Sequence, residues 1–293
     1  EYMAGLVVEH LDGQNQFVNW KGGKINSITS APAGNLYLTD AQALDSNRIF
    51  SSRLTYNKGS MVVHMLRYVL GDEDFYQGMR NFLNDPAIAY NYAVTTQVKQ
   101  HLEAVSGKDL TEFFNDWIYG EGYPSYQVNA EVVSATQTKI TLSQTSSHAG
   151  VSFFEMPVTL RLTGSSGQTE NVVLQHTQNN QQFVVDNNVG MVSGIEINPF
   201  NDIVSKDNQV TFKEVSNPVA EELKVFPNPT ETTFQVEIPQ KMKVDAMNLY
   251  SVNGKLVAQN ISNPYPSEQL ASGMYVLEIK TAEKTYHKKI IKN

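Results

Sequence analysis

The hydrophobic pattern of this chain changes its period at Pro124, and that change sets the order of its secondary structure. Before Pro124, apolar residues recur every three or four positions, which is the spacing of an amphipathic helix. After it, alternate positions are apolar, as in a half-buried strand, beginning with Tyr126, Val128, Ala130 and Val132. A chain of 293 residues is long enough for two or three domains, each with its own core. We therefore predict a multidomain α + β protein whose first part is all-helical.

The segment 54–71 has the strongest helical pattern in the chain. Its apolar positions form one stripe, and Gly71 can adopt the left-handed conformation that ends a helix. The stripe consists of Met61, Val62, Met65, Leu66 and Val69. Tyr56 lies in the first turn, where we expect a loop to enter the helix and leave the Tyr56 hydroxyl free to face a cleft. From the residues alone, however, Tyr56 is one of 14 tyrosines, and a half-buried packing role is favoured.

Further helices are predicted for residues 72–85, after Thr95 and after Asp109, with Asp72 as a candidate cap. Residues 12–53 are predicted to be loop-rich, because turn-forming pairs such as Gly22-Gly23 interrupt the pattern. This segment is expected to form surface and the rim of a cleft.

The β part of the sequence divides into two domains. About six or seven short strands indicate a β-sandwich over residues 125–212. Residues 213–221 lose all periodicity and are predicted to be a linker. Residues 222–293 return to strands, and Asn253-Gly254 between two apolar runs predicts a hairpin. The helical part is assigned to residues 1–124.

The composition excludes several classes of protein. The 22 Lys and Arg are outnumbered by 30 Asp and Glu, for a net charge of −8, and no basic face is evident, so we expect no nucleic-acid partner. No run approaches the roughly 18 to 20 apolar residues of a membrane span. The absence of cysteine rules out disulfides and thiolate metal sites.

The histidines do not form a metal-binding motif. None of the six stands four residues from another or directly precedes a glutamate, so a helical HExxH pair is absent. His64 lies in an apolar helix, where a hydrogen-bonded structural role is favoured over a ligand role. We predict no metal ligand and no cofactor-binding residue in this chain.

Three sequence blocks carry a family resemblance: NLYLTD, RIFSSRLTYNKGSMVVHMLRYVLGDEDFYQGMRNFL and LTEFFNDWIYGEGYP. Together they resemble the C-terminal half of the catalytic domain of the gluzincin zinc aminopeptidases, the aminopeptidase N family. The resemblance implies a thermolysin-like domain, zinc in the full-length enzyme and peptide substrates. It also implies a catalytic role for Tyr56, the tyrosine of Y-x-K-G, whose hydroxyl would donate a hydrogen bond to the oxyanion of the tetrahedral intermediate.

The same resemblance implies that the zinc-binding motifs of the family lie outside this chain. The family binds zinc through HExxH and a later glutamate in an N-E-G motif, and Glu1-Tyr2-Met3-Ala4 resembles the helix that follows that motif. We therefore expect the metal ligands, the general base and the substrate-amine site upstream of Glu1. This chain by itself is expected to bind no zinc and to be inactive.

Two more resemblances cover the β part. Residues 125–212, with FFEMPVTLRL and GIEINPFNDIV, are similar to the β-sandwich that follows the catalytic domain in this family. Residues 222–293, with VFPNPTETTF, LYSVNGKLV, LASGMYVLEI and HKKIIKN, are similar to the C-terminal sorting domain of the type IX (Por) secretion system. That similarity implies a small Ig-like sandwich that engages the secretion machinery, and export across the outer membrane to the surface or the medium. The alternative is an ordinary adhesive β-domain.

The sequence thus predicts the C-terminal portion of a secreted zinc-dependent metallo-aminopeptidase that hydrolyses N-terminal residues of peptides. The alternative is a non-catalytic, adhesin-like secreted binding protein in which the peptidase-derived helical part is only a scaffold.

Overall fold

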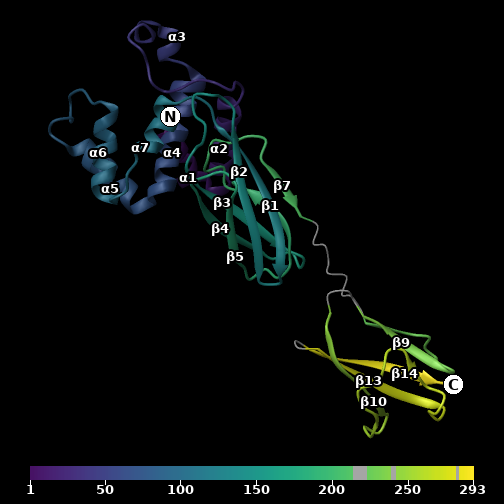
Figure 1. Cartoon of the computed structure of the whole chain (residues 1–293). Helices are drawn as coiled ribbons and strands as arrows, with labels where there is room; N and C mark the ends of the chain where they lie inside the picture. Colours follow the sequence, from purple (N-terminus) through teal and green to yellow (C-terminus); the bar gives the residue numbers. More distant parts are fainter. Residues whose placement is uncertain (214–222, 239–241, 282–283) are drawn as a thin grey trace. The chain divides into compact units, whose positions relative to one another are not determined.

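The computed structural model describes residues 1–213, 223–238, 242–281 and 284–293 (Figure 1). The chain forms two compact units, Glu1–Val215 and Ser216–Asn293, and each has its own hydrophobic core. Apart from Lys213, the predicted linker lies outside the described residues. Within the described parts, no helix is long and apolar enough to cross a membrane.

The first half of the larger unit is helical. Its α-helices are α1 (Tyr2–Asp12), α2 (Gln14–Ile28), α3 (Ser46–Ile49), α4 (Gly59–Leu70), α5 (Asp72–Asn84), α6 (Thr95–Ser106) and α7 (Thr111–Phe114). A short 3-10 helix, η1 (Gln42–Leu44), and two π-helices, η2 (Ser52–Lys58) and η3 (Asn115–Tyr119), lie between them. The predicted helix after Thr95 is confirmed as α6, and Gly107 ends it with a left-handed φ of 66°.

The loop prediction for residues 12–53 is wrong for its first part, because α2 occupies most of it and contains Gly22 and Gly23. Phe17, Ile25 and Ile28 lie on one face of α2 and are buried. Burying an apolar side chain contributes about 1.5–3 kcal/mol, whereas a glycine inside a helix costs about 1 kcal/mol. Tertiary burial therefore outweighs the two glycines.

Two details at helix starts also differ from the sequence prediction. Tyr56 lies inside the π-helix η2 and not in a loop that enters α4. Gly71 takes the cap position of α5, and Asp72 instead accepts hydrogen bonds from the Arg67 side chain at 2.7 and 2.9 Å. A two-pronged bond to a guanidinium satisfies the carboxylate more fully than one backbone amide does.

The second half of the larger unit is a β-sandwich. One sheet has the strand order β5-β2-β1-β7 and consists of β1 (Pro124–Ser134), β2 (Gln137–Ser146), β5 (Gln181–Asp186) and β7 (Gln209–Phe212). The other has the order β4-β3-β6 and consists of β3 (Met156–Gly164), β4 (Thr169–His176) and β6 (Val192–Ile197). Strand β7 runs parallel to β1, and the other pairs are antiparallel.

One hydrophobic core joins the sandwich to the helices. Along β1, alternate residues are buried, and Val128 pairs with Leu142 of β2. Both sheets contribute to the same buried cluster as the helices, and the Trp117 ring lies 4.6 Å from the Phe154 ring. The sandwich is thus a packing surface for the helical part and not a separate body.

The smaller unit contains two sheets, of order β11-β10-β13-β14 and β12-β9-β8. Its strands are β8 (Lys224–Phe226), β9 (Thr233–Glu237), β10 (Val244–Ser251), β11 (Leu256–Ala258), β12 (Tyr265–Pro266), β13 (Gly273–Thr281) and β14 (Thr285–Lys292). The hairpin predicted at Asn253-Gly254 is confirmed, because β10 pairs with β11 and Gly254 has a φ of 78°. The core of this unit centres on Leu249, Leu277 and Ile290.

Candidate functional site

Tyr56 is held by a helix with an unusual hydrogen-bond pattern. The Tyr56 amide donates to the Ser51 carbonyl at 3.2 Å, and the Gly59 amide bonds the Leu54 carbonyl, so both bonds span five residues. The Ser51 hydroxyl caps this π-helix by accepting from the Leu54 amide at 3.3 Å. Single π-helical turns are frequent at functional sites, because they place one side chain out of the regular helical register.

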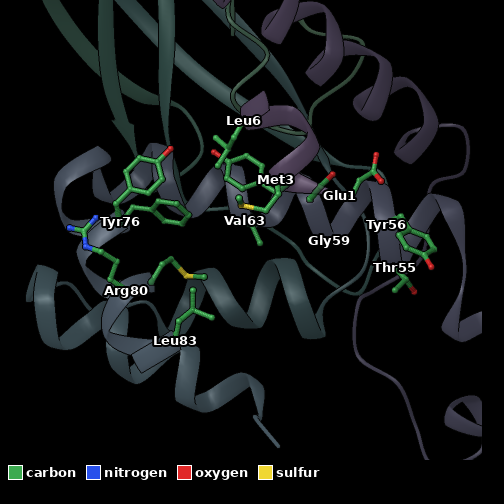
Figure 2. Close-up of a pocket in the computed structure, with 14 residues that line it drawn as sticks. Glu1, Met3, Leu6, Thr55, Tyr56, Gly59, Val63, Tyr76, Arg80 and Leu83 are labelled. Carbon is green, nitrogen blue, oxygen red and sulfur yellow. The ribbon is translucent and has the colours of Figure 1, made fainter. Parts of the chain in front are cut away.

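The Tyr56 ring borders an apolar pocket of about 580 Å³. Figure 2 shows Tyr56 and Thr55 at one end of this pocket and Tyr76 and Arg80 at the other. Between them the lining is mostly apolar, with Met3, Leu6, Val63, Met79 and Leu83, and Glu1 lies toward the Tyr56 end. Tyr56 is 41 % exposed, and among the described residues its hydroxyl has no hydrogen-bond partner. The phenol is therefore available to a molecule that enters this end of the pocket.

His64 lies on the buried face of α4, as a hydrogen-bonded structural residue. Its Nδ1 is 3.2 Å from the Tyr2 hydroxyl, and its Nε2 is 3.0 Å from Asp202 Oδ1 and 3.1 Å from Lys21 Nζ. The structural role that the sequence favoured for His64 is confirmed. Lys21 and Asp202 themselves form an ion pair of 2.5 Å, so α2, α4 and the loop after β6 meet at one buried charge cluster.

Burial governs the protonation of this cluster. It lowers the pKa of His64, because an imidazolium beside Lys21 would be poorly solvated and repelled. Burial also lowers the pKa of the Lys21 ammonium, although the charge of Asp202 opposes that effect. For Asp202, burial acts to raise the pKa, but the His64 hydrogen bond and the Lys21 charge outweigh it and the net shift is downward. The cluster is a neutral imidazole beside a buried ion pair.

Lys58, two residues after Tyr56, is a second buried lysine. Its side chain is only 1 % exposed, and Nζ donates to the carbonyls of Gly34 at 2.8 Å and Gly120 at 3.4 Å. Burial lowers its pKa to about 8, against the opposing charge of Glu121. Sequence reasoning missed this residue. Its position three and four residues before Met61 and Val62, on the apolar face, was the available signal for burial.

A zinc site does not fit the described residues. Among residues 1–213, 223–238, 242–281 and 284–293, no group of three or more His, Asp or Glu side chains could hold a metal ion.

Comparisons with known proteins agree with the resemblances drawn from the sequence. Residues 7–117 match the peptidase family M1 domain, and residues 224–293 match the secretion system C-terminal sorting domain. Aminopeptidase N of Lactococcus lactis subsp. lactis is 40 % identical over 90 residues, which are 31 % of this chain and 10 % of that protein. Alanine/arginine aminopeptidase of Saccharomyces cerevisiae is 30 % identical over 170 residues, which are 53 % of this chain and 18 % of that protein.

A third relative is the probable aminopeptidase 2 of Sulfurisphaera tokodaii, which is 28 % identical over 141 residues, or 47 % of this chain and 17 % of that protein. The chain thus spans between 10 % and 18 % of the length of these relatives. Among solved structures, one titled "Anomalous substructure of Titin-A168169" covers 59 % of this chain at 11 % identity, but its TM-score of 0.17 is too low to carry an argument.

Proposed function

Because this chain carries a peptidase family M1 segment followed by a secretion system C-terminal sorting domain, we propose that it is the C-terminal portion of a secreted zinc-dependent metallo-aminopeptidase. The proposed reaction is hydrolysis of the N-terminal residue of a peptide. The observation that supports it within this chain is the exposed Tyr56 phenol on a capped π-helix at the end of a pocket.

In this proposal, Tyr56 acts on the oxyanion that forms when water attacks the scissile carbonyl. A phenol stays protonated at neutral pH, so its O–H can donate one hydrogen bond to the developing negative charge. A donor placed in advance lowers the barrier because it does not have to reorganise during the reaction. The open hydroxyl and the capped, hydrogen-bonded backbone of η2 suit that task.

Zinc and its ligands belong, in this proposal, to a part of the protein outside this sequence. Zinc would supply an activated water in the complete enzyme. The short span of this chain relative to its relatives supports this division. The corresponding domain proposal assigns 1–124 to the helical part of a thermolysin-like catalytic domain and 125–212 to the adjoining sandwich, with a linker at 213–221.

The sorting domain indicates export, with a cell-surface or secreted location. We propose that residues 222–293 form an Ig-like sandwich that engages the type IX secretion machinery. Deleting residues 222–293 in a host with that machinery should retain the protein in the periplasm. Normal extracellular levels of the truncated protein would refute the sorting role and favour an adhesive module.

Tyr56→Phe in the full-length enzyme tests the catalytic proposal. Removing one oxyanion donor should lower kcat by about 10² to 10³, with KM nearly unchanged. Tyr119→Phe is a matched control, because Tyr119 is 40 % exposed and also lies in a π-helix but does not line the pocket. Near-normal kcat for Tyr56→Phe would make Tyr56 a packing residue. A full-length protein with no peptidase activity would favour the non-catalytic binding role.

A further inference from the structure

The ends of the two π-helices meet at the Lys58 ammonium. Lys58 is the last residue of η2, and one of its acceptors, Gly120, directly follows η3. The other acceptor, Gly34, lies in the segment between α2 and η1. One buried amine therefore connects three segments that are distant in the sequence.

The connection depends on glycine at both acceptors. Gly34 has a φ of +115°, and a Cβ there would lie 2.7 Å from Leu54 Cδ2. A Cβ at Gly120 would lie 2.3 Å from Val151 Cγ2 and 2.7 Å from the Asp116 carbonyl oxygen. No side chain fits at either position without a shift of its neighbours, so glycine is what brings these two carbonyls close to Lys58.

The two acceptor segments are also bonded to each other. The Gly34 amide donates to Glu121 Oε2 at 2.9 Å, and the Leu36 amide donates to the Ile118 carbonyl at 3.0 Å. The segments around Gly34 and Gly120 are thus hydrogen-bonded to each other, and Lys58 bonds the end of η2 to both of them. The Lys58 ammonium donates to two neutral carbonyls, and the nearby Glu121 carboxylate accepts from the Gly34 amide.

A buried ammonium bonded to neutral acceptors contributes less to stability than an apolar side chain of similar size, because a methionine could fill the same space without desolvating a charge. Unlike a methionine, the ammonium makes directional hydrogen bonds, which hold the Gly34 and Gly120 carbonyls in position relative to the end of η2. A π-helix contains one residue more than an α-helix of the same span. If η2 became α-helical, with hydrogen bonds between residues four apart, the side chains on the N-terminal side of the change would rotate by about 100° around the helix axis.

We propose that Lys58 is a positioning residue that holds η2 in its π-helical register and thereby keeps Tyr56 at the end of the pocket. The part of this inference that concerns catalysis rests on the proposed function. The part that concerns the position of η2 does not.

Hydrogen exchange of the intact protein, measured by mass spectrometry, tests the positioning role. In Lys58→Met, segments 34–37, 52–60 and 115–120 should all exchange faster together, by about tenfold or more, because one shared restraint is lost. Lys21→Met is the matched control, since Lys21 is also a buried lysine but bonds Asp202 and not the two glycines. There the increase should lie in α2 and α4, and segments 34–37 and 115–120 should stay within about threefold of the wild type.

Gly120→Ala gives a second variant that leaves the Lys58 side chain intact and should accelerate exchange in the same three segments. If both variants leave segments 34–37 and 52–60 as protected as in the wild type, or if Lys21→Met accelerates segments 34–37 and 115–120 as much as Lys58→Met does, the positioning role is refuted. In the full-length enzyme, Lys58→Met should lower kcat by about 10- to 100-fold with KM little changed, as expected for a misplaced donor. Full activity of Tyr56→Phe would refute the catalytic proposal and leave the exchange result standing.

Discussion

Replacing Asp202 by Asn should destabilise the larger unit by about 3–5 kcal/mol at pH 7, because it leaves the Lys21 ammonium buried without a counter-charge. The Lys21 and Asp202 side chains are 3 % and 14 % exposed, so water cannot replace the lost carboxylate. The asparagine keeps the shape of the side chain and can still accept from His64. The loss therefore measures the uncompensated charge and not a cavity.

The size of this effect has an upper limit set by deprotonation of Lys21. A lysine with an unfolded pKa near 10.4 can lose its proton at a cost of about 5 kcal/mol at pH 7 but only about 2 kcal/mol at pH 9. In the variant the folded pKa of Lys21 falls further, so the unfolded state binds more protons and stability rises with pH. The difference between wild type and Asp202→Asn should therefore shrink from pH 7 to pH 9.

Urea unfolding followed by tryptophan fluorescence measures this difference, because both tryptophans, Trp20 and Trp117, lie in the larger unit. Glu196→Gln is the control, since the Glu196 side chain is 57 % exposed in a surface ion pair and loss of that pair should change stability by less than about 1 kcal/mol. The double variant Lys21→Met, Asp202→Asn should recover most of the loss. A pH-independent difference, or a double variant no more stable than the single one, would refute the reasoning.

Three further predictions concern other parts of the fold. Burial lowers the pKa of His176 to about 4, so between about pH 6.5 and pH 4 the unfolded state binds a proton that the folded state does not. The free energy of unfolding should therefore fall by up to roughly 3 kcal/mol as the pH is lowered through this range. Urea unfolding at several pH values should show a smaller loss for His176→Gln, and an equal loss would contradict this prediction. Leu277→Ala should lower the unfolding free energy of the smaller unit by about 2–5 kcal/mol, because Leu277 is fully buried. Denaturation followed by NMR signals of that unit measures this loss, and a change below about 1 kcal/mol would mean a loosely packed core. Gly254→Ala places a side chain at a φ of 78° and should cost about 1 kcal/mol in the same assay, and a stabilising effect would mean that the hairpin turn differs.

The elements that local sequence determined are those whose signal lies within a few residues. The change of period at Pro124 gave the order of helices and strands, because side chains repeat every 3.6 residues on a helix and every two on a strand. Asn253-Gly254 marked a hairpin, since its turn needs a left-handed conformation that few other residues adopt.

Residue pattern alone did not identify Tyr56. One tyrosine among 14 carries no local mark of catalysis, and its proposed role came from the Y-x-K-G resemblance. The structure adds that Tyr56 is exposed, borders a pocket and lies in a π-helix. The oxyanion role remains a prediction for the full-length enzyme.

Tertiary structure alone decided the buried polar contacts and the elements that depend on them. Helix α2 forms despite Gly22 and Gly23 because its apolar face is covered, which no local propensity reports. His64 and Asp202 meet across 138 residues, and Lys58 reaches Gly120 across 62. Such contacts are set by which segments the folded core brings together, so only the folded structure shows which backbone carbonyls the buried Lys58 ammonium bonds.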